Sequence, residues 1–192
     1  FMNIKNYIEQ SIKTKQLILN DDNIINQINE IANVIVQAYQ KGNKVMTAGN
    51  GGSAGDAQHI AGELVSKFNF DRPPLAAIEL NTNSPLLTAI SNDYGYNKSF
   101  ARQIQANGKT GDVFIAISTS GHSENIIEAV EEANKMDIIT VGLIGNHDCP
   151  LDKTCQYIIK VPSTYTPNIQ EAQIMIGHIL CGLVEERIFT SH

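Results

Sequence analysis

The N-terminal segment of the chain carries apolar residues three and four positions apart, which is the spacing of one face of an α-helix. Ile24, Ile28, Ile31 and Ile35 show this spacing clearly. The pattern predicts amphipathic helices over residues 4–19 and 23–39, and the second is expected to end at Gly42, which can take a positive φ. We expect these two helices to form an N-terminal extension over about residues 3–41.

Short apolar runs bounded by turn residues follow, and they alternate with further helical patterns. The runs predict five strands, over residues 44–48, 75–80, 112–117, 138–144 and 157–161. Helices are predicted over residues 53–68, 84–91, 97–106, 123–136 and 168–188. This order predicts one doubly wound α/β domain over residues 2–192, with a five-stranded parallel sheet and helices on both faces. Ligands of such sheets bind at the carboxyl ends of the strands.

Composition and charge narrow the function classes. The 192 residues are 42% hydrophobic, which is enough for one buried core. The net charge of −6, with no run of Lys or Arg, argues against binding to nucleic acid or to an anionic membrane, so an anionic ligand needs local donors. No apolar stretch reaches the roughly 20 residues of a membrane span, and we expect a cytoplasmic protein. Three cysteines without a C-x-x-C pair indicate neither a disulfide framework nor a cysteine zinc site.

A segment rich in hydroxyl groups directly follows the predicted strand over residues 112–117. Residues 118–123, Ser-Thr-Ser-Gly-His-Ser, form what we call the serine loop, and they precede a helix whose first N–H groups and dipole favour an anion. The segment matches neither the Walker P-loop, whose lysine it lacks, nor a G-x-G-x-x-G dinucleotide loop. We interpret it as a phosphate site, and the alternative is an ordinary capped loop.

A glycine-rich turn follows the first predicted strand. Residues 49–52, Gly-Asn-Gly-Gly, form what we call the glycine turn, and Ser53 is expected to cap the next helix. In that helix His59 and Glu63 are four residues apart and share a face, where they could act as a base and a metal ligand. Such pairs are commonly just surface contacts. The backbone donors of the glycine turn favour the functional interpretation.

The last predicted helix carries two polar residues on an otherwise apolar element. Gln170 and His178 are joined by steps of four through Ile174, so they lie roughly along one side of the helix. A lone histidine in such a helix is usually a satisfied core residue. Here the helix after the glycine turn offers it potential partners.

Taken together, these segments resemble the phosphoheptose isomerases (sedoheptulose 7-phosphate isomerases) of the sugar-isomerase (SIS) domain superfamily, over nearly the whole chain. The matching stretches are Gly49-Asn50-Gly51-Gly52-Ser53, Asp56-Ala57-Gln58-His59, Glu63-Leu64, Leu87-Thr88-Ala89-Ile90, Asn92-Asp93-Tyr94-Gly95, Gly111-Asp112-Val113, Ile117-Ser118-Thr119-Ser120-Gly121, Ile169-Gln170-Glu171 and Gly177-His178-Ile179. One departure is His122, where asparagine is common in the family, and it leaves the hydroxyl pattern unchanged.

The resemblance implies a flavodoxin-like SIS domain in a homotetramer, with Glu63 and His178 as catalytic acid and base. It implies interconversion of sedoheptulose 7-phosphate and D-glycero-D-manno-heptose 7-phosphate, the first step toward ADP- or GDP-heptose for lipopolysaccharide or capsule. A zinc ion is implied at His59, Glu63, Gln170 and His178. The positions implied to contact the substrate are Asn50, Gly51, Gly52, Ser53, Glu63, Asn92, Asp93, Ser118, Thr119, Ser120, Ser123 and Gln170.

Such an isomerisation moves a proton between C1 and C2 through an enediol, so it needs a base near both carbons and a group that serves the oxygens. We expect Glu63 to be the base, because enclosure in a cleft would raise its pKa, and His178 to serve the oxygens or open the sugar ring. Zinc could polarise the carbonyl, although a metal-free route would need only these two side chains.

Three other functions fit parts of the pattern. A non-catalytic SIS protein that binds the replication initiator DnaA would have the same fold but no need of Glu63 and His178. A sugar-phosphate sensor would keep the serine loop and would normally carry a DNA-binding module, of which the sequence shows no sign. A transferase or lyase on the same domain remains open, because a fold does not determine a reaction.

Overall fold

The computed structural model describes residues 3–190, so Met2, Ser191 and His192 of the expected domain range lie outside it. Five parallel strands form one sheet in the order β2-β1-β3-β4-β5. This is the flavodoxin-like order, and it confirms the predicted architecture. The strands are β1 (Val45–Gly49), β2 (Ala77–Glu79), β3 (Val113–Ser118), β4 (Ile139–Gly145) and β5 (Tyr157–Val161).

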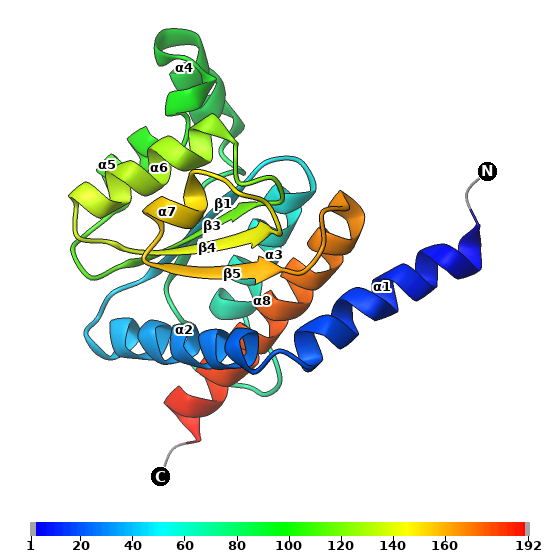
Figure 1. The fold of residues 1–192 in the computed structure, drawn as a ribbon. Coiled ribbons are helices and arrows are strands. Elements are labelled where there is room, and N and C mark those ends of the chain that lie inside the picture. Colours follow the sequence, from blue (N-terminus) through cyan, green and yellow to red (C-terminus); the bar gives the residue numbers. More distant parts are fainter. Residues whose placement is uncertain (1–2, 191–192) are drawn as a thin grey trace.

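Helices cover both faces of the sheet (Figure 1). One face is covered by α2 (Asp22–Gln40), α3 (Gly52–Val65) and α8 (Thr166–Phe189), and the other by α5 (Ala101–Asn107), α6 (Glu124–Lys135) and α7 (Leu151–Thr154). Successive residues of β3 point to opposite faces, so Ile115 packs in the first core and Phe114 in the second. Burial on both faces explains why this strand is an uninterrupted apolar run rather than an alternating one.

The two N-terminal helices differ in their relation to this body. Figure 1 shows α1 (Ile4–Leu19) projecting past α8, whereas α2 lies along the body of the domain. Buried Ile31 and Ile35 fix α2 in the first core. The side chain of Lys15 forms an ion pair of 3.0 Å with Glu171 and so ties α1 to the first turns of α8. The bounds of both helices agree with the predicted ranges to within one residue.

Several local boundaries differ from the predicted ones. The helix cap expected at Ser53 is instead at Gly51, whose φ of +57° favours glycine, and Ser53 is buried inside α3. The helix predicted over 84–91 runs on to residue 94 as α4 (Ser84–Tyr94), and Asn83 caps it, since its side chain accepts a hydrogen bond from the N–H of Leu86 at 3.1 Å. The helix predicted over 97–106 is divided into a 3₁₀ turn, η1 (Tyr96–Lys98), and α5.

Candidate active site

The glycine turn and the serine loop lie side by side at the carboxyl edge of the sheet. The glycine turn follows β1 and the serine loop follows β3, and these strands are direct neighbours with Gly49 opposite Ile117. Both loops therefore lie at the edge of the sheet where the predicted topology places ligand binding. The chain order of the strands reverses at β1, which makes the gap between β1 and β3 the topological switch point where ligands of such sheets bind.

The hydroxyl groups of the serine loop are not equivalent. Ser118 is buried, and its Oγ accepts a hydrogen bond from the N–H of Gly121 at 3.1 Å and lies 3.2 Å from the Oγ of Ser123. The Oγ of Ser120 accepts a hydrogen bond from the N–H of His122 at 3.2 Å. The side chain of Ser118 thus stabilises the conformation of the serine loop. Its hydroxyl hydrogen can still be donated to a ligand.

Backbone contacts fix the position of the serine loop. The carbonyl of Thr119 accepts a hydrogen bond of 3.0 Å from the N–H of Gly145, at the end of the neighbouring strand β4. Gly121 has a φ of +70°, and a Cβ there would lie 2.2 Å from the Sγ of Cys149. Glycine is therefore required on both backbone and steric grounds. Ser123 occupies the N-cap of α6 without a side-chain capping bond, which leaves the first N–H groups of the helix for an anion.

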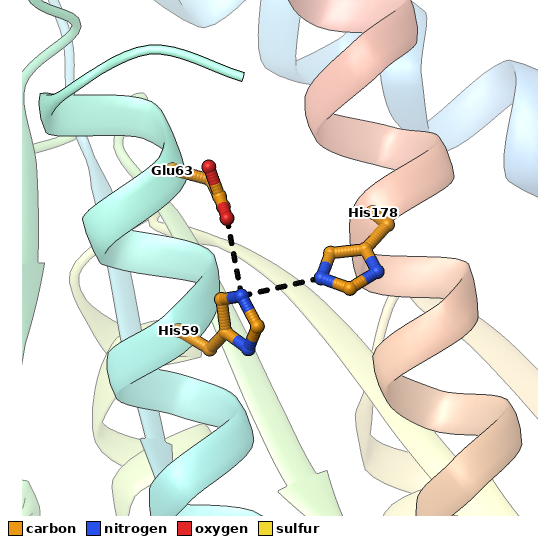
Figure 2. Close-up of side chains that lie close together, drawn as sticks. All are labelled: His59, Glu63 and His178. Atoms are coloured by element: carbon orange, nitrogen blue, oxygen red, sulfur yellow. Dashed lines mark hydrogen bonds and ion pairs between the residues drawn. The ribbon is translucent and has the colours of Figure 1, made fainter. Parts of the chain in front are cut away.

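Three side chains on α3 and α8 come together (Figure 2). The Nε2 of His59 lies 3.1 Å from the Oε1 of Glu63 and 3.3 Å from the Nε2 of His178. The predicted pairing of His59 with Glu63 on one helical face is observed. His178 approaches from α8 because the two helices pack together. The sequence indicated this contact only through the residue types involved.

A glycine and an aromatic ring set the geometry of this cluster. A Cβ on Gly177 would lie 2.7 Å from the Cδ1 of Ile60, so the missing side chain lets α3 and α8 pack closely at this level. Ile60 and Gly177 are the chain neighbours of His59 and His178. Phe68 stacks on the imidazole of His178, with 5.5 Å between the ring centroids. The close contact of the two imidazoles follows from this packing.

Gln170 lies at a different level of α8. A Cβ on Gly52 would be 2.5 Å from the Nε2 of Gln170, so this amide packs against the glycine turn. Gln170 precedes His178 by eight residues, which is about 12 Å along a helix axis. In this structure Gln170 therefore packs against Gly52, a predicted substrate contact, rather than against the two histidines.

The cluster of His59, Glu63 and His178 has the chemistry of a metal site. One ligand atom from each residue lies within 4.8 Å of the others. Two histidines and a glutamate are a known zinc ligand set, and a tetrahedral ion with Zn–N distances of about 2.0–2.1 Å holds its donor atoms about 3.3 Å apart. Two of the three donor-atom spacings, 3.1 and 3.3 Å, fit such an ion, and the third is at most 4.8 Å.

Asp56 is a nearby residue for which the sequence predicts no role of its own. It lies one turn before His59 on α3, and its Oδ2 is buried without a hydrogen-bond partner. Burial raises the pKa of Asp56 to about 6, and the charge of His59 opposes the shift. A buried carboxylate oxygen without a partner is a group that a bound ligand or cation would satisfy. Its signals in the sequence are its place in the family-like stretch 56–59 and its spacing of three from His59.

The structure keeps Asn92 and Asp93 apart from this cluster. Both are exposed near the end of α4, and the Nδ2 of Asn92 donates a hydrogen bond of 2.9 Å to the Oδ1 of Asp93. Among the described residues, neither forms a hydrogen bond with the serine loop, the glycine turn or the histidines. Figure 1 shows α4 at the far end of the sheet from the lower part of α8.

Comparisons with known proteins agree with this geometry. The SIS domain family model matches residues 6–145. The chain is 55% identical over 186 residues to phosphoheptose isomerase 2 of Campylobacter jejuni, covering 97% of this chain and 92% of that protein. It is also 55% identical to the phosphoheptose isomerase of Aneurinibacillus thermoaerophilus, covering 97% and 94%. The solved structure of a phosphoheptose isomerase from Francisella tularensis superposes with a TM-score of 0.91 at 36% identity, covering 95% and 96%. None of the helices in the described part of the chain is long and apolar enough to span a membrane.

Proposed function

The chain belongs to the phosphoheptose isomerases of the SIS-domain family, and we propose that it interconverts sedoheptulose 7-phosphate and D-glycero-D-manno-heptose 7-phosphate. One observation carries this proposal. Glu63 and His178 come from different helices and meet at His59, on the helix that follows the glycine turn. A protein that only bound a partner would not need this cluster. The product would feed the synthesis of nucleotide-activated heptose for lipopolysaccharide or capsule.

The serine loop is the proposed phosphate site. Thr119, Ser120 and Ser123 would donate hydroxyl hydrogens, and the free N–H groups at the start of α6 would donate as well. The net charge of −6 does not favour an anionic ligand. Local donors of this kind would therefore be needed to offset the charge of the phosphate. The glycine turn, Ser53, Gln170, Asn92 and Asp93 remain proposed contacts of the sugar.

The proposed chemistry moves two protons. The carboxylate of Glu63 removes a proton from C1 of the ketose, which gives an enediol, and returns it to C2 of the aldose. His178 donates a proton to the oxygen on C2 as that carbonyl becomes a hydroxyl, and it accepts the proton of the hydroxyl on C1. The Oε1 of Glu63 contacts His59, so the other carboxylate oxygen is available for the carbon-bound proton.

The proposed cofactor is zinc, held by His59, Glu63 and His178 with Gln170 as the fourth ligand. The spacing of the first three donor atoms supports this set. Gln170 now packs against Gly52, so it would have to turn toward the histidines to complete the shell. A bound zinc ion would supply a Lewis acid for the carbonyl oxygen.

The proposed assembly is a homotetramer of single domains, each spanning residues 2–192 with an N-terminal extension over about 3–41. Support comes from α1, where Ile4 and Leu19 are each 70% exposed and Ile8 and Ile12 about half exposed. An exposed stripe of isoleucines is typical of an interface between chains. Light scattering after size exclusion would give four chain masses for the wild type and fewer for the double variant Ile4→Gln/Ile8→Gln.

One assay tests the reaction. Purified protein is incubated with sedoheptulose 7-phosphate, and the C1 proton of the aldose is followed by NMR in buffer with and without a chelator. We expect the aldose to appear, and to appear more slowly with the chelator. The proposal is wrong if this substrate is unchanged while a shorter ketose phosphate, such as fructose 6-phosphate, is converted.

A further inference from the structure

Two asparagine side chains join the glycine turn to the helix that follows the serine loop. Asn50 lies in the glycine turn, and Asn125 is the second residue of α6. The Nδ2 of Asn50 donates a hydrogen bond of 2.8 Å to the Oδ1 of Asn125, and the Nδ2 of Asn125 donates one of 3.0 Å to the Oδ1 of Asn50. The two amides form a reciprocal pair between residues 75 positions apart in the chain.

Two further residues complete the network. The hydroxyl of Tyr96, on η1, donates a hydrogen bond of 2.8 Å to the Oδ1 of Asn50. The Nδ2 of Asn125 lies 3.4 Å from the Oγ of buried Ser99. An amide oxygen has two lone pairs, and an amide nitrogen has two hydrogens. Both lone pairs of Asn50 are therefore occupied, and one N–H is the single hydrogen-bonding group that its side chain can offer to a ligand.

The network borders an open cavity of about 480 Å³ that reaches the serine loop. Its lining residues are Asn50, Tyr96, Asn97, Ser123, Glu124 and Asn125. Asn125 itself is only 3% exposed, so it is a buried support rather than a ligand contact. Asn50 is half-buried between this support and the cavity.

The glycine turn needs such support because its own backbone is permissive. Gly51 and Gly52 carry no side chains that could restrict the turn. Asn81 holds the strand side, since its Nδ2 donates a hydrogen bond of 2.7 Å to the carbonyl of Gly49 and its Oδ1 accepts one of 3.3 Å from the Gly49 N–H. Asn125 and Tyr96 hold the other side at Asn50. A misplacement of about 1 Å in a substrate-positioning group can cost roughly 100-fold in rate.

These contacts lead to an inference that rests on the proposed function and deepens it. We infer that Asn125, with Tyr96, is a positioning residue that fixes Asn50 and the glycine turn relative to a sugar phosphate held at the serine loop. Asn125 touches neither the substrate nor the reacting atoms and acts through Asn50. The network sets the distance between the phosphate anchor and the sugar-binding turn.

The test is a double-mutant cycle on kcat/KM for sedoheptulose 7-phosphate. Asn125→Ala is expected to lower kcat/KM about 10- to 100-fold, and Tyr96→Phe, which removes a single O–H, about 3- to 10-fold. In an Asn50→Ala background, Asn125→Ala is expected to change kcat/KM less than about 2-fold, because a residue that acts only through Asn50 has nothing left to position. Independent effects that multiply in the double variant overturn the inference.

Asn134 supplies a matched control on the same helix. Its Nδ2 donates a hydrogen bond of 2.8 Å to the carbonyl of Thr154, and its Oδ1 accepts one of 2.9 Å from Thr140, away from both loops. Asn134→Ala should lower the melting temperature as Asn125→Ala does, but leave kcat/KM within about 2-fold of wild type. An equal loss of kcat/KM in both variants would show that general destabilisation is the cause and would overturn the inference.

Hydrogen exchange separates this inference from the proposed function. The amides of Ser53 and Ala54 donate hydrogen bonds to the carbonyls of Asn50 and Gly51. They are expected to exchange at least about 5-fold faster in Asn125→Ala than in wild type, whatever the substrate is. Unchanged exchange overturns the inference even if the enzyme converts the heptose. An inactive wild type with faster exchange in the variant overturns the proposed substrate and supports the network.

Discussion

The Nε2 of His59 lies 3.3 Å from the Nε2 of His178, so two imidazole nitrogens face each other across α3 and α8. A direct hydrogen bond between them requires a proton on one nitrogen and a lone pair on the other. The Oε1 of Glu63 also faces the Nε2 of His59, at 3.1 Å. A cation at the centre would let both imidazoles and the carboxylate act as electron-pair donors at once, which makes metal binding the first property to measure.

We predict that the purified protein binds about one zinc ion per chain. Calorimetry with Zn²⁺ after chelation should detect this site in the wild type, and His59→Ala should weaken the affinity at least about 100-fold, because one of three clustered ligands is lost. His147→Ala serves as a control, because this histidine is not part of the cluster. Equal zinc affinity in the wild type and in His59→Ala would refute the site.

The second prediction concerns proton transfer. Glu63→Gln keeps the shape of the side chain but removes its basicity, so kcat is expected to fall about 100- to 10,000-fold while the binding of substrate changes little. Stopped-flow or NMR rates and a separate binding measurement would distinguish the two effects. Glu186→Gln, an exposed change on α8, should leave both unchanged. A Glu63→Gln enzyme with near-normal kcat would remove Glu63 from the role of base.

Gly177 gives a third prediction, about helix packing. Gly177→Ala places a methyl group 2.7 Å from the Cδ1 and 2.8 Å from the Cγ1 of Ile60, so the Ile60 side chain or the helix must shift beside the two histidines. We expect a loss of stability of about 1–3 kcal/mol and weaker zinc binding. Chemical denaturation and calorimetry would measure the two.

Gly55 is the matched control for this change. It lies inside α3, and a Cβ there meets no atom within 4 Å. Gly55→Ala is therefore expected to stabilise the protein by about 0.5–1 kcal/mol through helix propensity alone. If Gly177→Ala behaved like Gly55→Ala, close helix packing would not be what sets the histidine contact.

A fourth prediction concerns stability at low pH. Burial alone would raise the pKa of Asp112, but hydrogen bonds from the Lys44 side chain, from the backbone N–H groups of Lys44 and Lys109, and from Asn43 lower it below its usual 3.8. A depressed carboxyl pKa gives stability that is present above the unfolded-state value and is lost as the pH falls through the folded-state value.

The measurement for this carboxylate is the free energy of unfolding between pH 2 and pH 7. Wild type should lose stability below about pH 4, and Asp112→Asn should be less stable at pH 7 by about 1–3 kcal/mol, with a flatter dependence at low pH. Parallel curves for the two proteins would mean that Asp112 does not contribute to the acid transition.

Periodicity and chain order were sufficient to predict much of this molecule. The apolar run of β3 and the isoleucine spacing of α2 reflect burial, which depends on local pattern. The convergence of the two loops follows from parallel topology. Ser118 was harder to interpret, because the sequence shows a hydroxyl but not that the N–H of Gly121 already uses it.

Contacts between distant side chains could not be predicted in the same way. The pairing of Asn50 with Asn125 depends on the relative positions of the glycine turn and the first turn of α6. Neither segment alone specifies it. Gln170 shares a helix side with His178 in projection, but the rise of the helix separates them, and the sequence pattern does not contain the partner Gly52. The sequence predicts Ser53 as the cap because serine is the commoner capping residue. The observed cap is Gly51, because the backbone at this position has a positive φ, which favours glycine.

Gln170 and Glu171 are chain neighbours that contact different parts of the protein. Gln170 packs against Gly52, while Glu171 is bound by Lys15 of α1. Consecutive residues of a helix point about 100° apart, so a single turn of α8 is held by the glycine turn on one side and by the projecting helix on the other. A displacement of α1 would therefore reach the glycine turn through two adjacent residues, without any change in the sheet.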